Sequence, residues 1–444
     1  MLIKFNFANM TTAIAIALKS IIDSKTKLVE LNQADFYWRR KIGQVIVSSD
    51  KPVYLVFPTT VDILAAIVRQ ASQKQWPILI CGNGSKLNWG NTSDNIQLVI
   101  STQKCDRLIE HAVGDLTVTV EAGMKLIDLQ AKLRSHNQFL PIDPSYPDTA
   151  TLGGIVATAD TGSWRERYGG IRDMLLGLSF VRPDGAVAKA GGRVVKNVAG
   201  YDLMKLFTGA YGTLGIISQV TFRTFPIIPT SQTLLLTGKA NNIATASQTI
   251  RNSGLTPIAM DLLSKGVIKQ LELDGNIALI ARWQAIPESI EQQVEQAKAI
   301  ADRLNLAAID YQNSAELDVW QKCNSMTTLP NSATAVTCKI GISPTTAVNF
   351  LQLEEIARNN TAVRIHASSG IGQMQLDNAD DQTINEMRWH CQNNYGFLTI
   401  LNAPATTKQQ LDVWGYRGNA IKTMQAIKNQ FDPQNILNCD RFIV

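Results

Sequence analysis

The sequence lacks several features that mark particular classes of protein. None of its six cysteines lies in a Cys-x-x-Cys pair, which excludes the common iron–sulfur and structural zinc motifs. No stretch approaches the roughly 18 uninterrupted apolar residues of a membrane-spanning helix, and no block of Lys and Arg indicates a nucleic-acid-binding arm. Charged residues make up only 18% of the chain, and the net charge of +5 is spread along it. We therefore predict no nucleic-acid partner and no direct insertion into a membrane.

The length and the scattered cysteines bound the class of protein further. A chain of 444 residues is long enough for two domains, and its 45% hydrophobic content is ordinary for a globular protein. Cysteines without a pairing pattern fit reduced thiols and a cytoplasmic location. The apolar patch near the N-terminus is broken by Asn6, Asn9 and Lys19, so we do not interpret it as a signal peptide. Any membrane association is expected to be peripheral and to depend on partners.

Glycine is concentrated in residues 191–226, around which the chain is organised. A short helix fits between Asp202 and Thr208, with Asp202 as its N-cap and Gly209 ending it in a left-handed turn. A strand follows in which apolar and polar residues alternate as far as Pro226. The glycine-rich turn before this strand suits the close approach of a flat cofactor to the main chain. Taken alone, the segment also fits a glycine-rich connection that binds nothing.

The first glycine loop along the chain follows a predicted strand at 78–81 and reads Gly82-Asn83-Gly84-Ser85. A dinucleotide-binding Rossmann turn would place its third glycine at position 87, which is Leu87, and no Gly-Lys-Ser/Thr completes a phosphate-binding P-loop. Successive backbone N–H groups of such a turn still form an anion-binding nest without a helix. The alternative is an ordinary surface turn.

The second glycine loop along the chain occupies residues 147–162. Its two adjacent glycines, Gly153 and Gly154, lie between hydroxyl-bearing residues. Adjacent glycines at the wall of a binding site offer N–H donors, because no Cβ stands in the way of a ring or a ribityl chain. We therefore expect replacement of Gly153 by Val to fill space that a cofactor needs.

The three glycine motifs, in their order along the chain, resemble the FAD-binding (PCMH-type) domain of the vanillyl-alcohol-oxidase type flavoproteins. Within that family they are most similar to the paired subunits of glycolate oxidase. The resemblance implies that the first loop holds the FAD pyrophosphate and that the later loops surround the flavin and ribityl groups. Relatives with covalent flavin place a His in the first loop, where this chain has Ser85, Lys86 and Leu87, so non-covalent FAD is expected. The residues thereby assigned to FAD are Gly82, Asn83, Gly84, Ser85, Lys86, Asp148, Thr151, Leu152, Gly153, Gly154, Thr158, Gly162, Gly215, Ile216 and Ile217.

The same resemblance implies an α+β fold. It comprises an N-terminal helical segment (1–50), a two-subdomain FAD-binding domain (51–228), an α/β cap domain with an antiparallel sheet (229–410) and a C-terminal segment that returns to the FAD domain (411–444). The aromatic residues Phe36, Tyr37 and Trp38 are expected to pack in the core. In the cap, Ser343 is expected to cap a helix begun by Pro344.

The catalytic subunits of this family carry a His-containing Gly-Asp-Gly-Asn metal motif and a later Glu-His-Gly motif. Here the first is reduced to His366 in an Ala-Ser-Ser-Gly context, which leaves too few ligands for a metal, so none is predicted. The second, at residues 395–401, offers no ionisable group near the expected position. We interpret His366 as a structural strand or turn residue, and His111, His136 and His390 have no motif support.

Because the FAD loops are intact while both catalytic motifs are eroded, the chain is similar to the FAD-binding subunits of glycolate oxidase. The resemblance implies oxidation of 2-hydroxy acids, glycolate to glyoxylate, with an acceptor other than oxygen, beside a catalytic flavoprotein subunit and an iron–sulfur subunit. One alternative is a self-sufficient dehydrogenase in which His366, Tyr168 or Tyr201 is the base. Another is a structural partner with a vestigial flavin site. Lys196 is a further weak candidate, as a cation beside the flavin.

Overall fold

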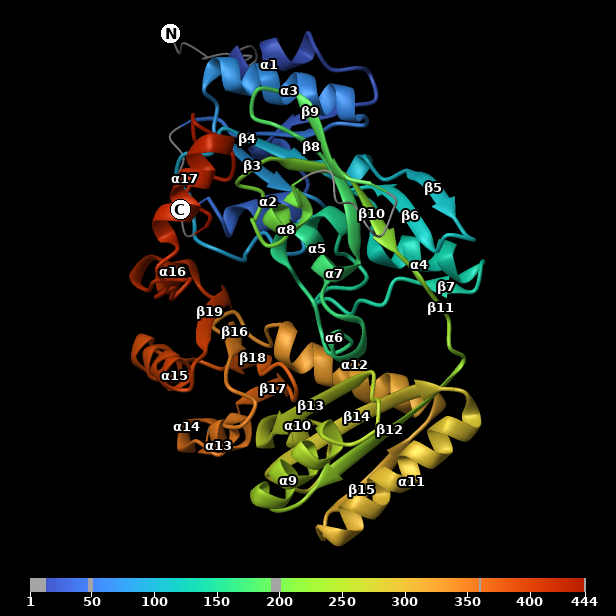
Figure 1. Cartoon of the computed structure of the whole chain (residues 1–444). Coiled ribbons are helices and arrows are strands. Elements are labelled where there is room, and N and C mark those ends of the chain that lie inside the picture. Colours follow the sequence, from blue (N-terminus) through green and yellow to red (C-terminus); the bar gives the residue numbers. More distant parts are fainter. Residues whose placement is uncertain (1–12, 47–50, 193–200, 359–360, 443–444) are drawn as a thin grey trace.

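The computed structural model describes residues 13–46, 51–192, 201–358 and 361–442. The candidate residue Lys196 lies outside these ranges. The chain forms two halves in Figure 1: one with two sheets above, and one with a single large sheet below. Among the described residues, no helix is both long and apolar enough to cross a lipid bilayer.

The first sheet of the N-terminal half has four strands in the order β1-β2-β4-β3. Strands β2, β4 and β3 are parallel, and β1 is antiparallel to β2. Helix α3 packs on this sheet because Leu64, Ile67 and Val68 recur at helical spacing and are buried. Its N-cap is Thr60, whose Oγ1 accepts a hydrogen bond from the Ile63 N–H. The elements are α1 (Ala13–Lys19), β1 (Lys27–Glu30), α2 (Phe36–Gly43), β2 (Tyr54–Phe57), α3 (Val61–Lys74), β3 (Ile78–Cys81) and β4 (Leu98–Ser101).

The second sheet is antiparallel, with five strands in the order β5-β6-β10-β8-β9. The predicted helix after Asp202 forms as α8, and the Asp202 side chain accepts from the Lys205 N–H. Gly209 has φ +81° and so takes the left-handed conformation that was predicted. The elements are β5 (Leu108–Ala112), β6 (Thr117–Glu121), α4 (Leu126–Arg134), β7 (Gln138–Phe139), α5 (Leu152–Thr158), α6 (Arg165–Tyr168), α7 (Ile171–Met174), β8 (Leu175–Val181), β9 (Val187–Gly191), α8 (Leu203–Phe207), β10 (Ile216–Arg223) and β11 (Phe225–Pro226), of which β11 pairs with β7.

The other half is built on an antiparallel sheet of eight strands in the order β15-β12-β14-β13-β17-β18-β16-β19. One face of this sheet packs on α9, α11, α13 and α15. The opposite face packs on α10 and α12 and turns Asp261 toward the N-terminal half. The elements are β12 (Thr230–Thr237), α9 (Ala240–Arg251), β13 (Ala259–Ser264), α10 (Lys265–Gln270), β14 (Ile277–Ala285), α11 (Pro287–Arg303), β15 (Ala307–Tyr311), α12 (Asn313–Thr328), β16 (Val336–Gly341), α13 (Ala347–Leu351), α14 (Glu354–Arg358), β17 (Ala362–His366), β18 (Ile371–Leu376), α15 (Asp381–Asn393) and β19 (Phe397–Asn402).

The C-terminal segment, red in Figure 1, runs from the large sheet back to the first sheet through α16 (Ala405–Gln410) and α17 (Ile421–Phe431). Its end pairs with β3: the Ile78 N–H donates to the Ile436 carbonyl over 2.7 Å, and the Asn438 N–H donates to the Ile78 carbonyl over 2.8 Å. The Asn438 side chain accepts from the Ile80 N–H over 2.7 Å. These contacts bring the last residues beside the loop that follows β3.

Two local expectations are wrong. Of the three aromatic residues on α2, only Trp38 is buried, whereas Phe36 is 70% and Tyr37 41% exposed. Tyr37 instead donates its hydroxyl to the Asn83 carbonyl over 2.6 Å, because α2 begins beside the first glycine loop. The cap helix begins at Ala347 rather than after Ser343, since residues 343–346 form a turn in which the Thr346 N–H bonds the Ser343 carbonyl.

Candidate cofactor pocket and active site

The three glycine segments converge on one pocket in the N-terminal half. It encloses about 810 Å³ of space between the loop after β3, the start of α5 and the start of β10. The C-terminal residues Asn438 and Arg441 complete its wall. The predicted residues that line it are Gly82, Asn83, Gly84, Ser85, Lys86, Thr151, Gly153, Gly154, Thr158, Gly215, Ile216 and Ile217.

The first glycine loop presents unused backbone donors to this pocket. Within the described chain, the backbone N–H groups of Asn83, Gly84, Ser85 and Lys86 donate no hydrogen bond, while the Asn83 carbonyl is held by Tyr37. Gly84 has φ +74°, a conformation that favours glycine and that turns successive N–H groups to one side. The loop therefore has the chemistry of a pyrophosphate cradle.

The second glycine motif works differently from the sequence expectation. Residues 152–158 form helix α5, capped by Thr151. The N–H groups of Leu152, Gly153 and Gly154 are already used, on the Met124 and Ala122 carbonyls and on Thr151 Oγ1 respectively. They are therefore not free donors for a ligand, and the helix contributes its surface instead.

Gly153 and Gly154 have different roles in this wall. A Cβ on Gly153 would lie 2.8 Å from the Cβ of Ala122, so the space beside it is filled by the protein and not reserved for a cofactor. A Cβ on Gly154 would meet only Thr151 Oγ1, at 3.2 Å, on the pocket side. The expected reason for the effect of a Gly153 substitution is thus wrong, and Gly154 is the position that keeps the pocket open.

Three predicted cofactor residues lie outside the pocket lining. Asp148 is exposed, and Leu152 is fully buried in the hydrophobic core. Gly162 packs against Asp143, whose carbonyl would lie 2.3 Å from a Cβ at that position. Each of these residues is part of the scaffold around the loops. The sequence analysis missed Trp89, Tyr211, Gly212, Asn438 and Arg441, all of which line the pocket.

A buried ion pair stands at one end of the pocket. Lys86 Nζ lies 2.8 Å from Asp160 Oδ2, and both side chains are about as buried as core residues, 6% and 4% exposed. Burial lowers the pKa of Lys86, and the charge and hydrogen bond of Asp160 partly restore it. Its ammonium also lies 5.4 Å from the Trp89 ring. Lys86 therefore places a buried positive charge at the wall of the pocket.

Two further buried cations hold the backbone after the first loop. Arg441 donates to the carbonyls of Leu87, Trp89 and Asn91. Lys408, from the cap half, donates to the intervening carbonyls of Asn88 and Gly90. Burial, with the nearby Arg441 charge, lowers the pKa of Lys408 to about 7. Segments 318 or more positions apart thus fix the strip of chain that carries Trp89.

A second, smaller cavity of about 340 Å³ opens between the two halves, and Trp89 lines both it and the large pocket. Asp160 lines the cavity while its partner Lys86 lines the pocket. Thr161 follows Asp160 in this wall, and the rest comes from the large sheet: Lys339, Arg364, His366, Ile371, Gly372, Gln373 and Leu401. The cavity is therefore directly beside one end of the cofactor pocket.

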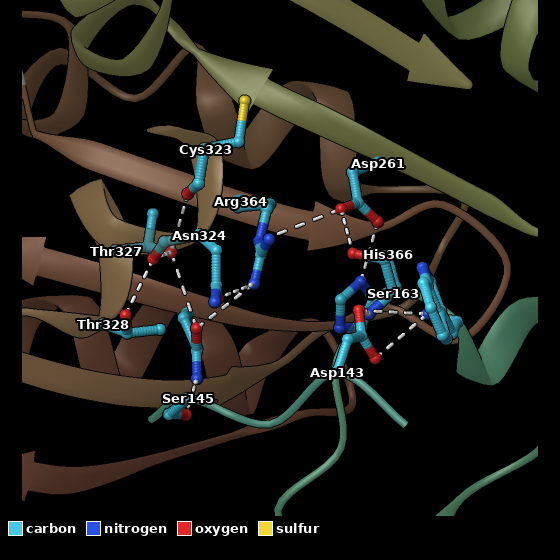
Figure 2. Close-up of polar contacts among 12 residues, drawn as sticks. Asp143, Ser145, Ser163, Asp261, Cys323, Asn324, Thr327, Thr328, Arg364 and His366 are labelled. Atoms are coloured by element: carbon cyan, nitrogen blue, oxygen red, sulfur yellow. Dashed lines mark hydrogen bonds and ion pairs between the residues drawn. The ribbon is translucent and has the colours of Figure 1, made fainter. Parts of the chain in front are cut away.

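His366 is a paired, buried residue of this cavity rather than a plain turn residue. It ends β17, and its Nδ1 lies 2.7 Å from Oδ1 of Asp261 on the adjacent strand β13 (Figure 2). Asp261 is fully buried and also accepts a hydrogen bond from the Ser163 hydroxyl. Burial alone would raise the pKa of Asp261, but His366, Arg364 and Ser163 together lower it. A carboxylate at Nδ1 orients the ring and leaves Nε2 as the nitrogen available for proton transfer.

Further ionisable groups surround this pair, as Figure 2 shows. Arg364 Nε lies 3.8 Å from Asp261 Oδ2, and its Nη2 donates to Asn324. Asp143 accepts from the Ser163 N–H over 2.7 Å, and burial raises its pKa to about 6. Lys339 makes no hydrogen bond or ion pair with any described residue, and burial lowers its pKa. Ionisable groups are thus abundant here, and Asp143, Asp261 and Lys339 lie on segments that neither eroded motif includes.

The other candidate bases are not in this cavity. Tyr201 is 91% exposed. Tyr168 packs its ring on Phe139 and Phe225. His111 and His136 contact each other near the far edge of the second sheet, and His390 lies on α15. Across the described ranges, no group of three or more His, Cys, Asp or Glu side chains is placed to hold a metal ion.

The comparisons with known proteins agree with this geometry. Residues 52–191 match a family model described as an FAD binding domain. The chain is 25% identical over 458 residues to glycolate oxidase subunit GlcD of Bacillus subtilis (strain 168), covering 94% of this chain and 96% of that protein. It is 35% identical over 161 residues to glycolate oxidase subunit GlcE of Escherichia coli (strain K12), covering 36% of this chain but only 45% of that protein. The chain is an FAD-dependent oxidoreductase that is similar to these glycolate oxidase subunits.

The fold of the flavoprotein matches solved structures over nearly its whole length. p-Cresol methylhydroxylase, solved with substrate bound, aligns with a TM-score of 0.74 at 14% identity, covering 96% of each chain. Chitooligosaccharide oxidase aligns with a TM-score of 0.69 at 13% identity, covering 97% of this chain and 99% of that one. At these identities the likeness shows the fold, which is the expected FAD-binding half followed by a cap with an antiparallel sheet.

The pocket residues fit FAD. Free N–H groups at residues 83–86 suit the pyrophosphate, and the glycines of α5 and of the turn before β10 leave a surface without side chains for the rest of the molecule. One possible attachment group, the thiol of Cys81, also lines the pocket. Burial raises the pKa of Cys81 to about 12, so the reactive thiolate is scarce near neutral pH. Non-covalent binding therefore stays the prediction.

Proposed function

We propose that this flavoprotein oxidises small 2-hydroxy acids, with glycolate as the substrate of first choice, in the cavity lined by His366. The observation that carries the proposal is that the FAD pocket and this cavity share Trp89 and the Lys86–Asp160 pair as a common boundary. A substrate in the cavity would therefore lie beside the end of the pocket. Bound FAD supplies the hydride acceptor for such an oxidation.

The cavity residues divide into two roles. Lys339 and Arg364 are cations with donors to spare, since Lys339 has no partner in the described chain and Arg364 Nε makes no hydrogen bond there. They suit the carboxylate of the acid. His366, oriented by Asp261, suits removal of the hydroxyl proton at Nε2, and Asp261 stabilises the charged ring that results.

This proposal differs from the sequence-level interpretation, which left the chemistry to a partner because both catalytic motifs were eroded. The specific observation against a purely FAD-holding role is the buried His366–Asp261 pair beside three further ionisable side chains. A chain with a vestigial site would have no need to bury these charges together. The named relatives, two glycolate oxidase subunits and a D-lactate dehydrogenase of Archaeoglobus fulgidus, support a hydroxy-acid substrate.

The test is turnover with a panel of acids. FAD-loaded protein would be assayed with an artificial electron acceptor and glycolate, D-lactate, L-lactate and 2-hydroxyglutarate, with glycolamide as the uncharged control. We expect turnover of at least one short 2-hydroxy acid and none of glycolamide. Absence of turnover with every acid, in protein that retains its flavin, would contradict the proposal.

Membership of a multi-subunit complex is a second proposal. Its support is that two relatives are named as glycolate oxidase subunits. In such an assembly this chain would pass electrons to an acceptor other than oxygen through an iron–sulfur subunit, beside a second flavoprotein subunit. Purification of the native protein from its own cells under mild conditions should recover such subunits. Recovery of the chain alone, with full activity, would contradict complex membership without affecting the proposed chemistry.

A further inference from the structure

A third pocket lies at the boundary between the two halves, outside the cavity described above. It has about 730 Å³ of space, and its walls combine α6 of the FAD-binding half with the end of α9 and the start of β13 from the cap. Its lining residues are Glu166, Arg167, Ile250, Arg251, Leu255, Thr256, Pro257, Met260 and Ser368. Two arginines, one carboxylate and an apolar patch thus face a common space.

The pocket and the His366 cavity share their structural supports. Ser368, two residues after His366, donates its hydroxyl to Glu166 Oε1 over 2.6 Å. Glu166 comes three residues after Ser163, which donates to Asp261. The same two short segments, 163–166 and 366–368, therefore hold the catalytic pair on one side and line the outer pocket on the other. The pocket and the His366 cavity therefore lie on two sides of the same segments, although no residue lines both.

Arg251 is the unusual residue of the pocket. It makes no hydrogen bond or ion pair with any described residue, and its Nε is buried without a partner. A buried guanidinium nitrogen without an acceptor is costly, and an anion in the pocket would supply one. Glu166 is the acidic neighbour: it accepts a hydrogen bond from Ser368, and the Arg251 charge partly offsets the rise that burial causes in the pKa of Glu166. Arg167, which is exposed, adds a second positive charge at the pocket mouth.

We propose that this pocket is an anion-binding vestibule that takes the carboxylate of a small organic acid before it enters the His366 cavity. The identity of the acid as the substrate rests on the proposed function, but the anion site itself does not. Arg251 binds the carboxylate, Arg167 attracts it from solution, and Leu255, Pro257 and Met260 contact its carbon chain. The vestibule raises the local concentration of the acid and has no part in the chemical step.

The test compares Arg251→Gln with Arg303→Gln, a control arginine exposed at the end of α11. Oxalate binding to the oxidised, FAD-loaded proteins would be measured by calorimetry at low ionic strength. We expect one oxalate site fewer in Arg251→Gln than in wild type or Arg303→Gln. In rapid-mixing experiments, the second-order rate of flavin reduction at low glycolate should fall several-fold, while the rate at saturating glycolate stays within about twofold.

The outcomes separate the two proposals. If Arg251→Gln binds as many oxalate ions as Arg303→Gln with the same affinity, the vestibule proposal is wrong, whatever the turnover. If the oxalate site is lost in Arg251→Gln but no hydroxy acid reduces the flavin, the vestibule stands and the proposed substrate class fails. A fall in the saturating rate alone, without loss of an oxalate site, would assign Arg251 to another role and overturn the vestibule.

Discussion

Asp261 and His366 are 105 positions apart in the sequence and face each other across strands β13 and β17, with 2.7 Å between Oδ1 and Nδ1. Strand pairing, and not a local motif, creates this pair. Ser163 reaches the same carboxylate from the FAD-binding half, so the site forms only when the two halves meet. The pair therefore links the assembly of the fold to the chemistry of the cavity.

Replacement of Gly154 by Val is expected to block FAD without unfolding the protein. The new side chain would project into the pocket, and overpacking of this kind costs about 1–3 kcal/mol, or roughly tenfold to hundredfold in affinity. Flavin content and FAD titration measure the effect. Gly43→Val, on a helix end with open space around it, is the control and should retain normal loading. Normal FAD affinity in folded Gly154→Val would contradict the placement of the cofactor.

Precipitation of the holoprotein with acid is expected to release all its flavin into the supernatant. The first loop has no His, and burial holds the pKa of the Cys81 thiol at about 12. Absorbance of pellet and supernatant gives the result directly. Flavin that stays in the pellet, and is released in a Cys81→Ser variant, would show a covalent thioether instead.

Asp143 is expected to impose a measurable pH dependence on folding stability. Its pKa is about 6 in the folded protein, against about 3.9 in an unfolded chain, so the folded state binds the proton more tightly. This group therefore makes the protein lose stability as the pH rises from about 4 to 6, by at most about 1.4 kcal/mol per pH unit. Denaturant unfolding of Asp143→Asn should lack this component. Identical pH profiles for wild type and variant would contradict it.

Lys408 is expected to change the folding stability at higher pH than Asp143 does, and in the opposite direction. Its pKa is about 7 in the folded protein, below the roughly 10.4 of a free lysine, so the unfolded state binds more protons between these values. Wild-type stability should therefore rise across this range relative to Lys408→Met. The control is Lys422→Met, an exposed position on α17. Parallel stability curves for wild type and Lys408→Met would show that Lys408 titrates normally.

The cofactor half could be predicted from sequence because its signals are local. Glycines at special backbone positions and apolar residues at helical spacing gave β3, α3, α8 and the three loops within a few residues. The predicted roles of individual residues were wrong where a residue distant in the sequence determines the local packing or hydrogen bonding. Gly153 is required by Ala122 and not by the cofactor, and the N–H groups at residues 152–154 are used by the preceding segment and by the cap of α5.

The candidate catalytic side chains could not all be predicted in the same way. The eroded cap motif pointed to His366, whereas the ionisable groups around it come from separate stretches: Asp143, Asp160, Asp261 and Lys339. None of these stretches has a recognisable spacing, because cross-strand register and contact between the halves bring them together. Asn438 and Arg441 were missed for the same reason, since only the docked C-terminus places them at the pocket.

The central claim is that His366 takes part in oxidation of a hydroxy acid by this chain. Its most direct test is anaerobic stopped-flow mixing of FAD-loaded protein with glycolate, comparing wild type, His366→Gln and the exposed control His136→Gln. We predict flavin bleaching by wild type and His136→Gln, and a rate roughly 10²- to 10⁴-fold lower in His366→Gln with FAD still bound. Equal bleaching rates in all three proteins would contradict the claim.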